Sequence, residues 1–166
     1  MISKQDSFAF DVGSPLPKPF NVEDNEGGGT LSINNNLLFF TKCSKISGNY
    51  NNCDIYFSEK IDGLWGDIRS LSDKICPNYS WESQPSLSSD GKTLFFASDR
   101  DGGYGGIDLY KITKNYLGFW GEPVNLGPSI NSPNNEKSPF LHPDGKTLYF
   151  ASDNFPSLGG YDIFIS

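Results

Sequence analysis

The sequence predicts an all-β protein built from four-stranded antiparallel sheets of the β-propeller type, with three such sheets' worth of strands. The main observation is a repeated phrase: residues 90–99 return almost unchanged as residues 144–153, 54 positions later. Residues 34–41 hold the same place in an earlier, more divergent copy. A period of this length, with several short β-like runs per copy, is typical of propeller blades, which cannot bury their faces alone. No segment shows the apolar stripe and caps of a helix.

The second copy is complete and defines the expected blade. Its four strands are predicted at residues 84–89, 93–98, 107–112 and 120–126. Asp90-Gly91 is predicted to form the tight turn between the first two strands, because glycine accepts the positive φ that such a turn needs. Residues 94–97 are apolar on both faces, as expected for a strand that lies between neighbouring sheets. Pro123 is tolerated because the fourth strand is an edge.

This template divides the single propeller region into four parts. They are an outer strand and crossover (1–25), a first blade (26–81), a second blade (82–135) and a third blade without its outer strand (136–166). The first part is identified by four residues that match Trp120, Leu126, Ile130 and Asn131 at a shift of 110, namely Phe10, Leu16, Phe20 and Asn21. Residues 8–16 are therefore predicted to be an outer strand that belongs to no blade of its own.

The spare strand at one end corresponds to the strand that is missing at the other. Three blades are too few to close a ring, since closed propellers use about four to eight. Two interpretations remain open. Two copies of the chain self-associate into a six-bladed ring and exchange their N-terminal strands, or the chain is a fragment of a longer propeller.

Composition narrows the classes of partner. The formal net charge is −7 at pH 7, which disfavours binding to nucleic acid or to anionic membrane surfaces. No apolar run is long enough for a membrane span, and the N-terminus has no apolar signal core. The chain is therefore either cytosolic or the mature part of an exported protein. No cofactor is expected.

The three cysteines leave two alternatives. Cys43 and Cys53 flank residues 44–52, which the repeat places in a hairpin loop. Cysteines at the two ends of such a loop can face each other across antiparallel strands and form a disulfide, or remain buried thiols. Cys76 is left over. Without a Cys-x-x-Cys pair or histidine partners, a zinc site is not expected.

Two phrases carry a resemblance to a known family. Residues 84–92 and 138–146 each lead into a Phe-Ala-Ser-Asp sequence, and this pattern resembles the TolB-type WD-repeat-like propeller. With residues 126–131 and 159–162 included, the chain looks most similar to propellers of Bacteroidetes-type envelope proteins, which are often fused to an OmpA-like domain. The resemblance implies a non-enzymatic binding scaffold in the periplasm, within an outer-membrane assembly. No OmpA-like sequence occurs here, so peptidoglycan binding is not inferred.

The candidate binding residues lie on one predicted rim. Alternate strand connections share a rim, so the Gly-rich loops 102–106 and 158–161 should lie beside the crossovers 78–82 and 131–136. Tyr79 and Trp81 depart from the repeat, which favours a role in an interface. The candidate partner-binding residues are Tyr79, Trp81, Glu26, Glu82, Glu136, Tyr104, Asn134 and Asn135.

The three glutamates have two interpretations. Glu26, Glu82 and Glu136 enter the innermost strand of each copy, where an acidic collar at the mouth of the channel could bind a cation or a basic peptide. Alternatively, each carboxylate accepts backbone N–H groups of its own crossover, and recurrence in every copy favours this structural role.

Enzymatic function is not expected. His142 is the only histidine and falls at a turn position, and there is no Gly-x-Ser-x-Gly sequence. Asp99, Asp101 and Asp108 depart from the spacing of known calcium loops, so no metal is predicted. The favoured function is a scaffold for protein–protein interaction in a bacterial cell envelope. The alternative is a carbohydrate-binding or carbohydrate-cleaving propeller, because rim acids from different blades could form a catalytic pair.

Overall fold

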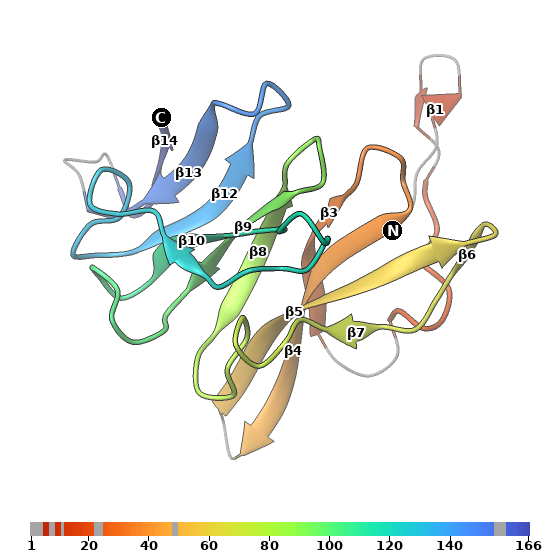
Figure 1. The fold of residues 1–166 in the computed structure, drawn as a ribbon, viewed down its shortest axis with the longest axis horizontal. Coiled ribbons are helices and arrows are strands. Elements are labelled where there is room, and N and C mark those ends of the chain that lie inside the picture. Colours follow the sequence, from red (N-terminus) through yellow and green to blue (C-terminus); the bar gives the residue numbers. More distant parts are fainter. Residues whose placement is uncertain (1–4, 7–8, 11, 22–24, 48–49, 155–158) are drawn as a thin grey trace.

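The computed structural model describes residues 5–6, 9–10, 12–21, 25–47, 50–154 and 159–166. The protein is all-β, with three antiparallel sheets and a small two-stranded ribbon, and the second sheet lies between the first and the third (Figure 1). Over these residues the sheets do not close into a ring. No described helix has the length and apolar character needed to cross a membrane.

Each sheet is formed by strands that follow one another in the sequence. The ribbon pairs β1 (Gln5–Asp6) with β2 (Ala9–Phe10). The first sheet contains β3 (Asn25–Leu31), β4 (Leu37–Ser47), β5 (Tyr50–Ile61), β6 (Leu64–Trp65) and β7 (Arg69–Ser70). The second contains β8 (Glu82–Leu87), β9 (Thr93–Ser98), β10 (Asp108–Thr113) and β11 (Val124–Asn125). The third contains β12 (Glu136–Leu141), β13 (Leu148–Ser152) and β14 (Asp162–Ile165).

The first strands of the three sheets, β3, β8 and β12, lie next to one another. The amide of Leu87 on β8 donates to Thr30 Oγ1 on β3 at 3.1 Å. The equivalent amide on β12, Leu141 N, donates to Ser86 Oγ on β8 at 3.0 Å. The register of each strand shifts at the same repeat position, where the backbone has a φ of about +52° to +57°. The three strands are therefore equivalent in three dimensions as well as in sequence.

The turns after these strands are also equivalent. Asp90 Oδ1 accepts the Lys92 amide at 3.0 Å, and Asp144 Oδ1 accepts the Lys146 amide at 2.8 Å. In the first copy Asn34 Oδ1 takes the same role, and Asn35 adopts a φ of +59° where the other copies have glycine. Asparagine tolerates this left-handed region better than most residues. The divergent first copy thus makes the same turn with different residues.

Two hydrophobic clusters join the sheets face to face. The cluster between the first and second sheets includes Phe39, Ile55, Leu94, Phe96 and Ile112. The cluster between the second and third sheets includes Ala97, Leu109, Leu148 and Phe150. Leu94 and Phe96 on β9, and their equivalents Leu148 and Phe150 on β13, are 0%, 0%, 7% and 6% exposed. The repeated phrase therefore places the same buried side chains on the second strand of each of these two sheets.

Three predicted segments differ in the structure. Residues 8–16 do not form one long strand: Ala9–Phe10 pairs with β1, residues 15–17 have no regular structure, and Phe8 and Asp11 lie outside the described residues. A strand needs hydrogen-bonding partners along its length, and in the described part of the chain this segment pairs as a strand at Ala9–Phe10 only. The expected strand 120–126 is reduced to Val124–Asn125, because Pro123 has no amide to donate.

The third difference is the hairpin that contains the cysteines. The expected loop at residues 44–52 is mostly strand, since β4 continues to Ser47 and β5 begins at Tyr50. Cys43 and Cys53 are therefore opposite one another within a ladder and do not mark the ends of a loop. Continued pairing satisfies the backbone N–H and C=O groups that a long loop would leave to water.

Candidate binding rim

The connections on one edge of the molecule form a continuous surface, which we call the crossover rim and define as residues 77–81, 99–107, 131–135 and 159–161. The amide of Trp81 donates to Asp99 Oδ1 at 2.7 Å, which ties the first crossover to the Gly-rich loop. The amide of Gly106 donates to the Asn134 carbonyl at 2.7 Å, which ties that loop to the second crossover. The predicted grouping is therefore present for the Gly-rich loop 102–106 and the two crossovers. Residue 158 of the second Gly-rich loop lies outside the described residues.

The Gly-rich loop fits against the second crossover because Gly105 has no side chain. A Cβ on Gly105 would lie 2.1 Å from the Asn134 carbonyl oxygen and 2.5 Å from that of Ser132. The loop is also held from below by Asp108, which is buried and accepts the amides of Tyr104 and Gly105. This sequence pattern, glycines followed by an aspartate that opens a strand, fixes the backbone from which Tyr104 projects.

The crossovers are held by aspartates that follow the second strands. Asp153 accepts the backbone amide of Asn135 at 2.9 Å and its side-chain amide at 3.0 Å. The bond from the Asn135 side chain lowers the pKa of Asp153 below its ordinary value. Asp99, at the equivalent position, holds the amide of Trp81. Asn135 is half-buried in this arrangement, so its side chain serves the frame of the rim.

Two tyrosines and an asparagine among the predicted residues project from the rim. Tyr79 is 74% exposed and Tyr104 is 52% exposed, and Asn134 is exposed as well. Trp81 is half-buried and packs on the cluster between the second and third sheets. Tyr161, which the sequence analysis did not select, is 44% exposed at the far end of the rim. Its signal was the Gly-Gly-Tyr sequence of the third copy.

The repeated glutamates are part of the interior. Glu82 and Glu136 are both 0% exposed. Glu136 accepts the amide of Ser132 at 2.8 Å and the hydroxyls of Ser132 and Ser152 at 2.6 Å each. Glu82 accepts two hydroxyls in the same way, from Ser80 at 2.7 Å and Ser98 at 2.6 Å.

These contacts correct the inclusion of the glutamates among the partner-binding candidates. Glu82 and Glu136 have no surface for a partner to contact, because each joins its crossover to the end of the second strand. Glu26 is half-buried and accepts the amide of Asn21 at 2.9 Å. The geometry favours the structural interpretation over an acidic collar.

Glu82 also belongs to a buried polar cluster that the repeat does not predict. Three atoms that could bind a metal ion, a carboxylate oxygen of Asp54, the Sγ of Cys76 and a carboxylate oxygen of Glu82, lie within 4.8 Å of one another. The guanidinium of Arg100 donates to Glu82 Oε1 at 3.0 Å and lies over the Phe96 ring at 5.3 Å from its centroid. Arg100 and Cys76 have different residue types in the other copies, so no repeat signal indicated this cluster.

The protonation chemistry of this cluster does not favour a metal. Burial raises the pKa of the Cys76 thiol to about 12, so the thiolate that a soft metal ion requires is disfavoured. Burial also raises the pKa of Glu82 and of Asp54. The Arg100 guanidinium already places a positive charge against Glu82. The arrangement is that of a buried ion pair between the first and second sheets.

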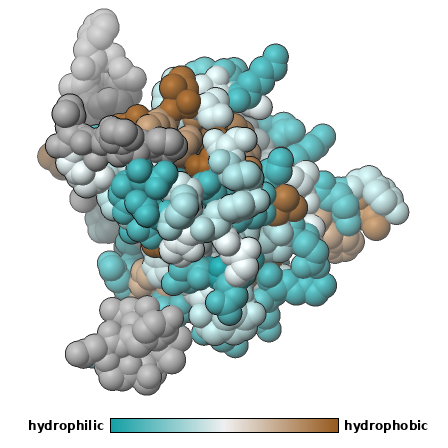
Figure 2. Space-filling model, turned by 90° about the vertical axis from the view of Figure 1, so that its left-hand side faces the viewer, coloured by the Kyte–Doolittle hydropathy of each residue, from teal (hydrophilic) through white to brown (hydrophobic). Residues whose placement is uncertain are grey.

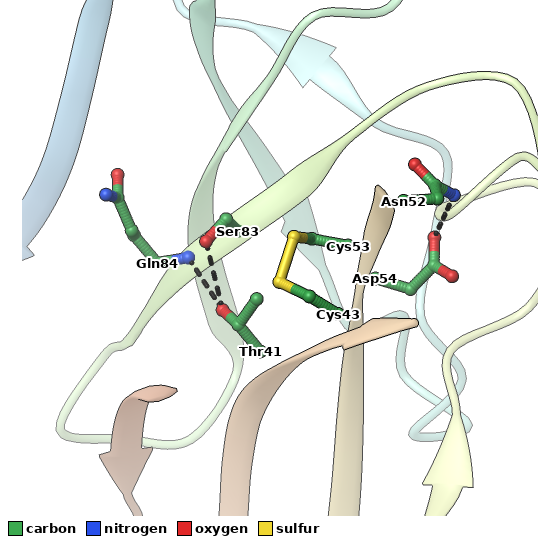
Figure 3. Close-up of a disulfide and its surroundings, with 7 residues drawn as sticks. All are labelled: Thr41, Cys43, Asn52, Cys53, Asp54, Ser83 and Gln84. Carbon is green, nitrogen blue, oxygen red and sulfur yellow. Dashed lines mark hydrogen bonds between the residues drawn. A yellow bond between two sulfur atoms is a disulfide. The ribbon is translucent and has the colours of Figure 1, made fainter. Parts of the chain in front are cut away.

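A disulfide joins Cys43 and Cys53 across β4 and β5, as Figure 3 shows. Next to it, Thr41 Oγ1 accepts the Gln84 amide at 3.0 Å and lies 3.1 Å from Ser83 Oγ, so the same part of β4 is bonded to the second sheet. Cys76 is a free, buried cysteine.

A groove of about 720 Å³ lies away from the rim, between residues 28–31, 84–89 and 138–141 of the three first strands. None of the described residues that line it is acidic, so it does not supply the paired carboxylates of a glycosidase. His142 lies outside it at an exposed turn, where its Nδ1 lies 3.2 Å from the amide nitrogen of Asp144, which donates to it.

Comparisons with known proteins leave the family open. No family model matches this chain, and no curated protein is significantly similar to it. Inferences about function therefore rest on the equivalent sheets and on the side chains that the crossover rim exposes.

Proposed function

We propose that the three sheets are blades of a TolB-type propeller and that the protein is a non-enzymatic scaffold, which binds a protein partner through its crossover rim in a bacterial envelope. The observation that carries this proposal is the contrast on the rim. Its backbone is fixed by repeated aspartates and glycines, whereas Tyr79, which departs from the repeat, and Tyr104 are exposed. Exposed tyrosines on a rigid frame are typical of protein-binding surfaces.

The propeller assignment is supported by the arrangement of the sheets. Their first strands lie side by side with equivalent cross-sheet hydrogen bonds from Leu87 to Thr30 and from Leu141 to Ser86. The sheets pack face to face through apolar clusters, as blades do. A TolB-type propeller combines this arrangement with the phrases that lead into Phe-Ala-Ser-Asp.

An envelope location is supported by the disulfide. Cross-strand disulfides persist in oxidising compartments such as the periplasm and are rare in the cytosol. The net charge of −7 fits a partner with a neutral or basic surface. The disulfide and the resemblance together support the proposal of an outer-membrane-associated assembly.

The hydrogen bonds of the rim carboxylates favour a binding role over carbohydrate cleavage. Asp99 and Asp153 accept backbone amides of the crossovers, and Asp108 accepts amides of the Gly-rich loop. Carboxylates engaged in this way hold the backbone and are not placed as a free acid and base.

A photo-crosslinking amino acid placed at position 79 tests the proposal in envelope extracts. We expect it to form a defined adduct with one protein, which mass spectrometry identifies and which is then purified. Binding of that protein, measured by calorimetry, should weaken at least tenfold, about 1.4 kcal/mol, in Tyr79→Ala and in Tyr104→Ala.

Tyr116→Ala is the matched control, because Tyr116 is 95% exposed in the turn that follows β10, at the opposite edge of the second sheet. Its affinity should equal that of the wild type. Equal losses in all three variants, or none in any, would contradict a binding site on the crossover rim. Binding of soluble glycans that depends on Tyr79 would instead favour the carbohydrate-binding alternative.

A further inference from the structure

The third sheet has one apolar face that no other part of the described chain covers. The register of β12, β13 and β14 places five apolar residues on this face, which we call the open face: Phe140, Tyr149, Ala151, Ile163 and Ile165. Lys137, the partner of Ala151 in the register, lies on the same face. Ile163 is 82% exposed, Ile165 is 64% exposed and Phe140 is 54% exposed. Figure 2 views the molecule from the side of the third sheet, and hydrophobic residues appear there among hydrophilic ones.

The junction between the second and third sheets shows what such a face normally contacts. Ala97 and Leu109 of the second sheet are the equivalents of Ala151 and Ile163, 54 residues earlier. Both are 0% exposed. They are covered by three side chains of the third sheet, Leu148, Phe150 and Phe164. The open face therefore lacks a neighbouring sheet with side chains equivalent to Leu148, Phe150 and Phe164.

The first sheet presents that set on the face that points away from the second sheet. Leu38 and Phe40 occupy the positions of Leu148 and Phe150, and Tyr56 occupies the position of Phe164. Phe40 is paired with Tyr56 in the register just as Phe150 is paired with Phe164. The rings also lie at similar separations, 6.3 Å and 5.8 Å between centroids. We call this the closing face.

The N-terminal segment covers Phe40, which is 5% exposed, and leaves Leu38 and Tyr56 half-buried. Phe20 packs edge-on against Phe40 with a centroid separation of 5.5 Å. A cavity of about 330 Å³ remains between Leu16, Phe20, Leu38 and Phe40. In the internal junction the equivalents of Leu16 and Phe20 are Leu126 and Ile130, which pack between two sheets. Residues 16–20 thus have the geometry of a crossover that is missing the preceding sheet.

From this match we propose that the open face of one copy packs on the closing face of a second copy, and that its β14 edge takes up the other copy's N-terminal segment. The inference rests on the proposed blade assignment and names self-association as a further interaction. Because each copy carries both faces, a two-fold axis generates two identical junctions and a ring of six sheets. The internal junction of the chain is the template for both.

Light scattering on the purified chain at micromolar concentrations tests this directly. The wild type should have twice the chain mass of 18.3 kDa. Ile163→Glu places a charge in each junction, where burial of an unpaired carboxylate is strongly unfavourable, and should return the mass to that of one chain. Ile163 is 82% exposed in the single copy. Its replacement by glutamate should therefore leave the single chain folded, with a cooperative unfolding transition in denaturant.

Ile33→Glu is the matched control, because Ile33 is 80% exposed but lies outside both faces. It should keep the doubled mass. A mixing experiment adds a stricter requirement. Leu38→Glu disables the closing face, so this variant alone should be monomeric, yet a mixture with Ile163→Glu should form dimers that retain one intact junction.

Three results would overturn the proposal: a wild type of single-chain mass, a dimer that survives Ile163→Glu, or a mixture that remains monomeric. These outcomes are separable from a failure of the proposed function. A monomeric wild type that still binds its partner through Tyr79 would refute self-association and retain the proposed scaffold function. A dimer without any Tyr79-dependent partner would retain self-association and refute the proposed scaffold function.

Discussion

Truncation of Phe96 to alanine measures how tightly the first and second sheets are packed. Phe96 is 0% exposed, and its ring stacks on Tyr110 with a centroid separation of 6.1 Å and lies beneath the Arg100 guanidinium. A phenylalanine buries roughly 150–250 Å², which at ~25 cal/mol per Å² corresponds to about 4–6 kcal/mol. Alanine keeps the Cβ, so we expect the free energy of unfolding to fall by about 3–5 kcal/mol.

The measurement is urea unfolding followed by tryptophan fluorescence, since Trp120 packs against the same cluster. Phe119→Ala is the control, because Phe119 is 67% exposed in a turn of the same sheet, and its change should stay within about 0.5 kcal/mol. A loss for Phe96→Ala no greater than that for Phe119→Ala would refute the packing of the sheets that is described above.

Three further predictions concern the thiols, a turn and the Gly-rich loop. In denaturant without reductant the protein should show one reactive thiol, that of Cys76, and in the native state none, because Cys76 is buried with a raised pKa; rapid native labelling would contradict this. Asp144 has a lowered folded pKa, owing first to the hydrogen bond from the Lys146 amide, so its stabilisation is present above the unfolded pKa and is lost as the pH falls through the folded value. Asp144→Asn should therefore lower the urea midpoint at pH 7 and lower it progressively less below about pH 4, and a deficit independent of pH would argue against the turn contacts. Gly105→Ala should lower the thermal midpoint, since its Cβ would lie 2.1 Å from a carbonyl oxygen, whereas Gly159→Ala, with no atom within 4 Å of its Cβ, should leave the midpoint unchanged.

The repeated phrases predicted the fold where local sequence decides it. The Asp90 turn and the apolar strand after it follow from residues that are adjacent in the chain, and both recur at Asp144. The long hairpin around Cys43 was not predictable, because its polar residues carry no signal that separates strand from loop. The N-terminal strand was predicted too long, since a strand needs hydrogen-bonding partners along its length and the described part of this segment is paired as a strand only at Ala9–Phe10.

The candidate site was predicted only where neighbouring residues in the chain determine it. Grouping of the Gly-rich loops with the crossovers follows from the alternation of strand connections, and it placed Tyr79 and Tyr104 on one edge. Burial of Glu82 depends on Arg100 and two serines that are brought together only by folding. The open face could not be recognised before the register was known, because Ile163 belongs to an ordinary apolar strand in the sequence.

Small-angle X-ray scattering of the wild-type chain tests the central claim most directly, namely that its three sheets are half of a ring. From the scaling of compact proteins, two associated copies should have a radius of gyration of about 20 Å, whereas a single compact copy should have about 15 Å. We predict the larger value, a reduction toward the smaller one in Ile163→Glu, and no change in Ile33→Glu. A radius of about 15 Å for the wild type would contradict closure by a second copy.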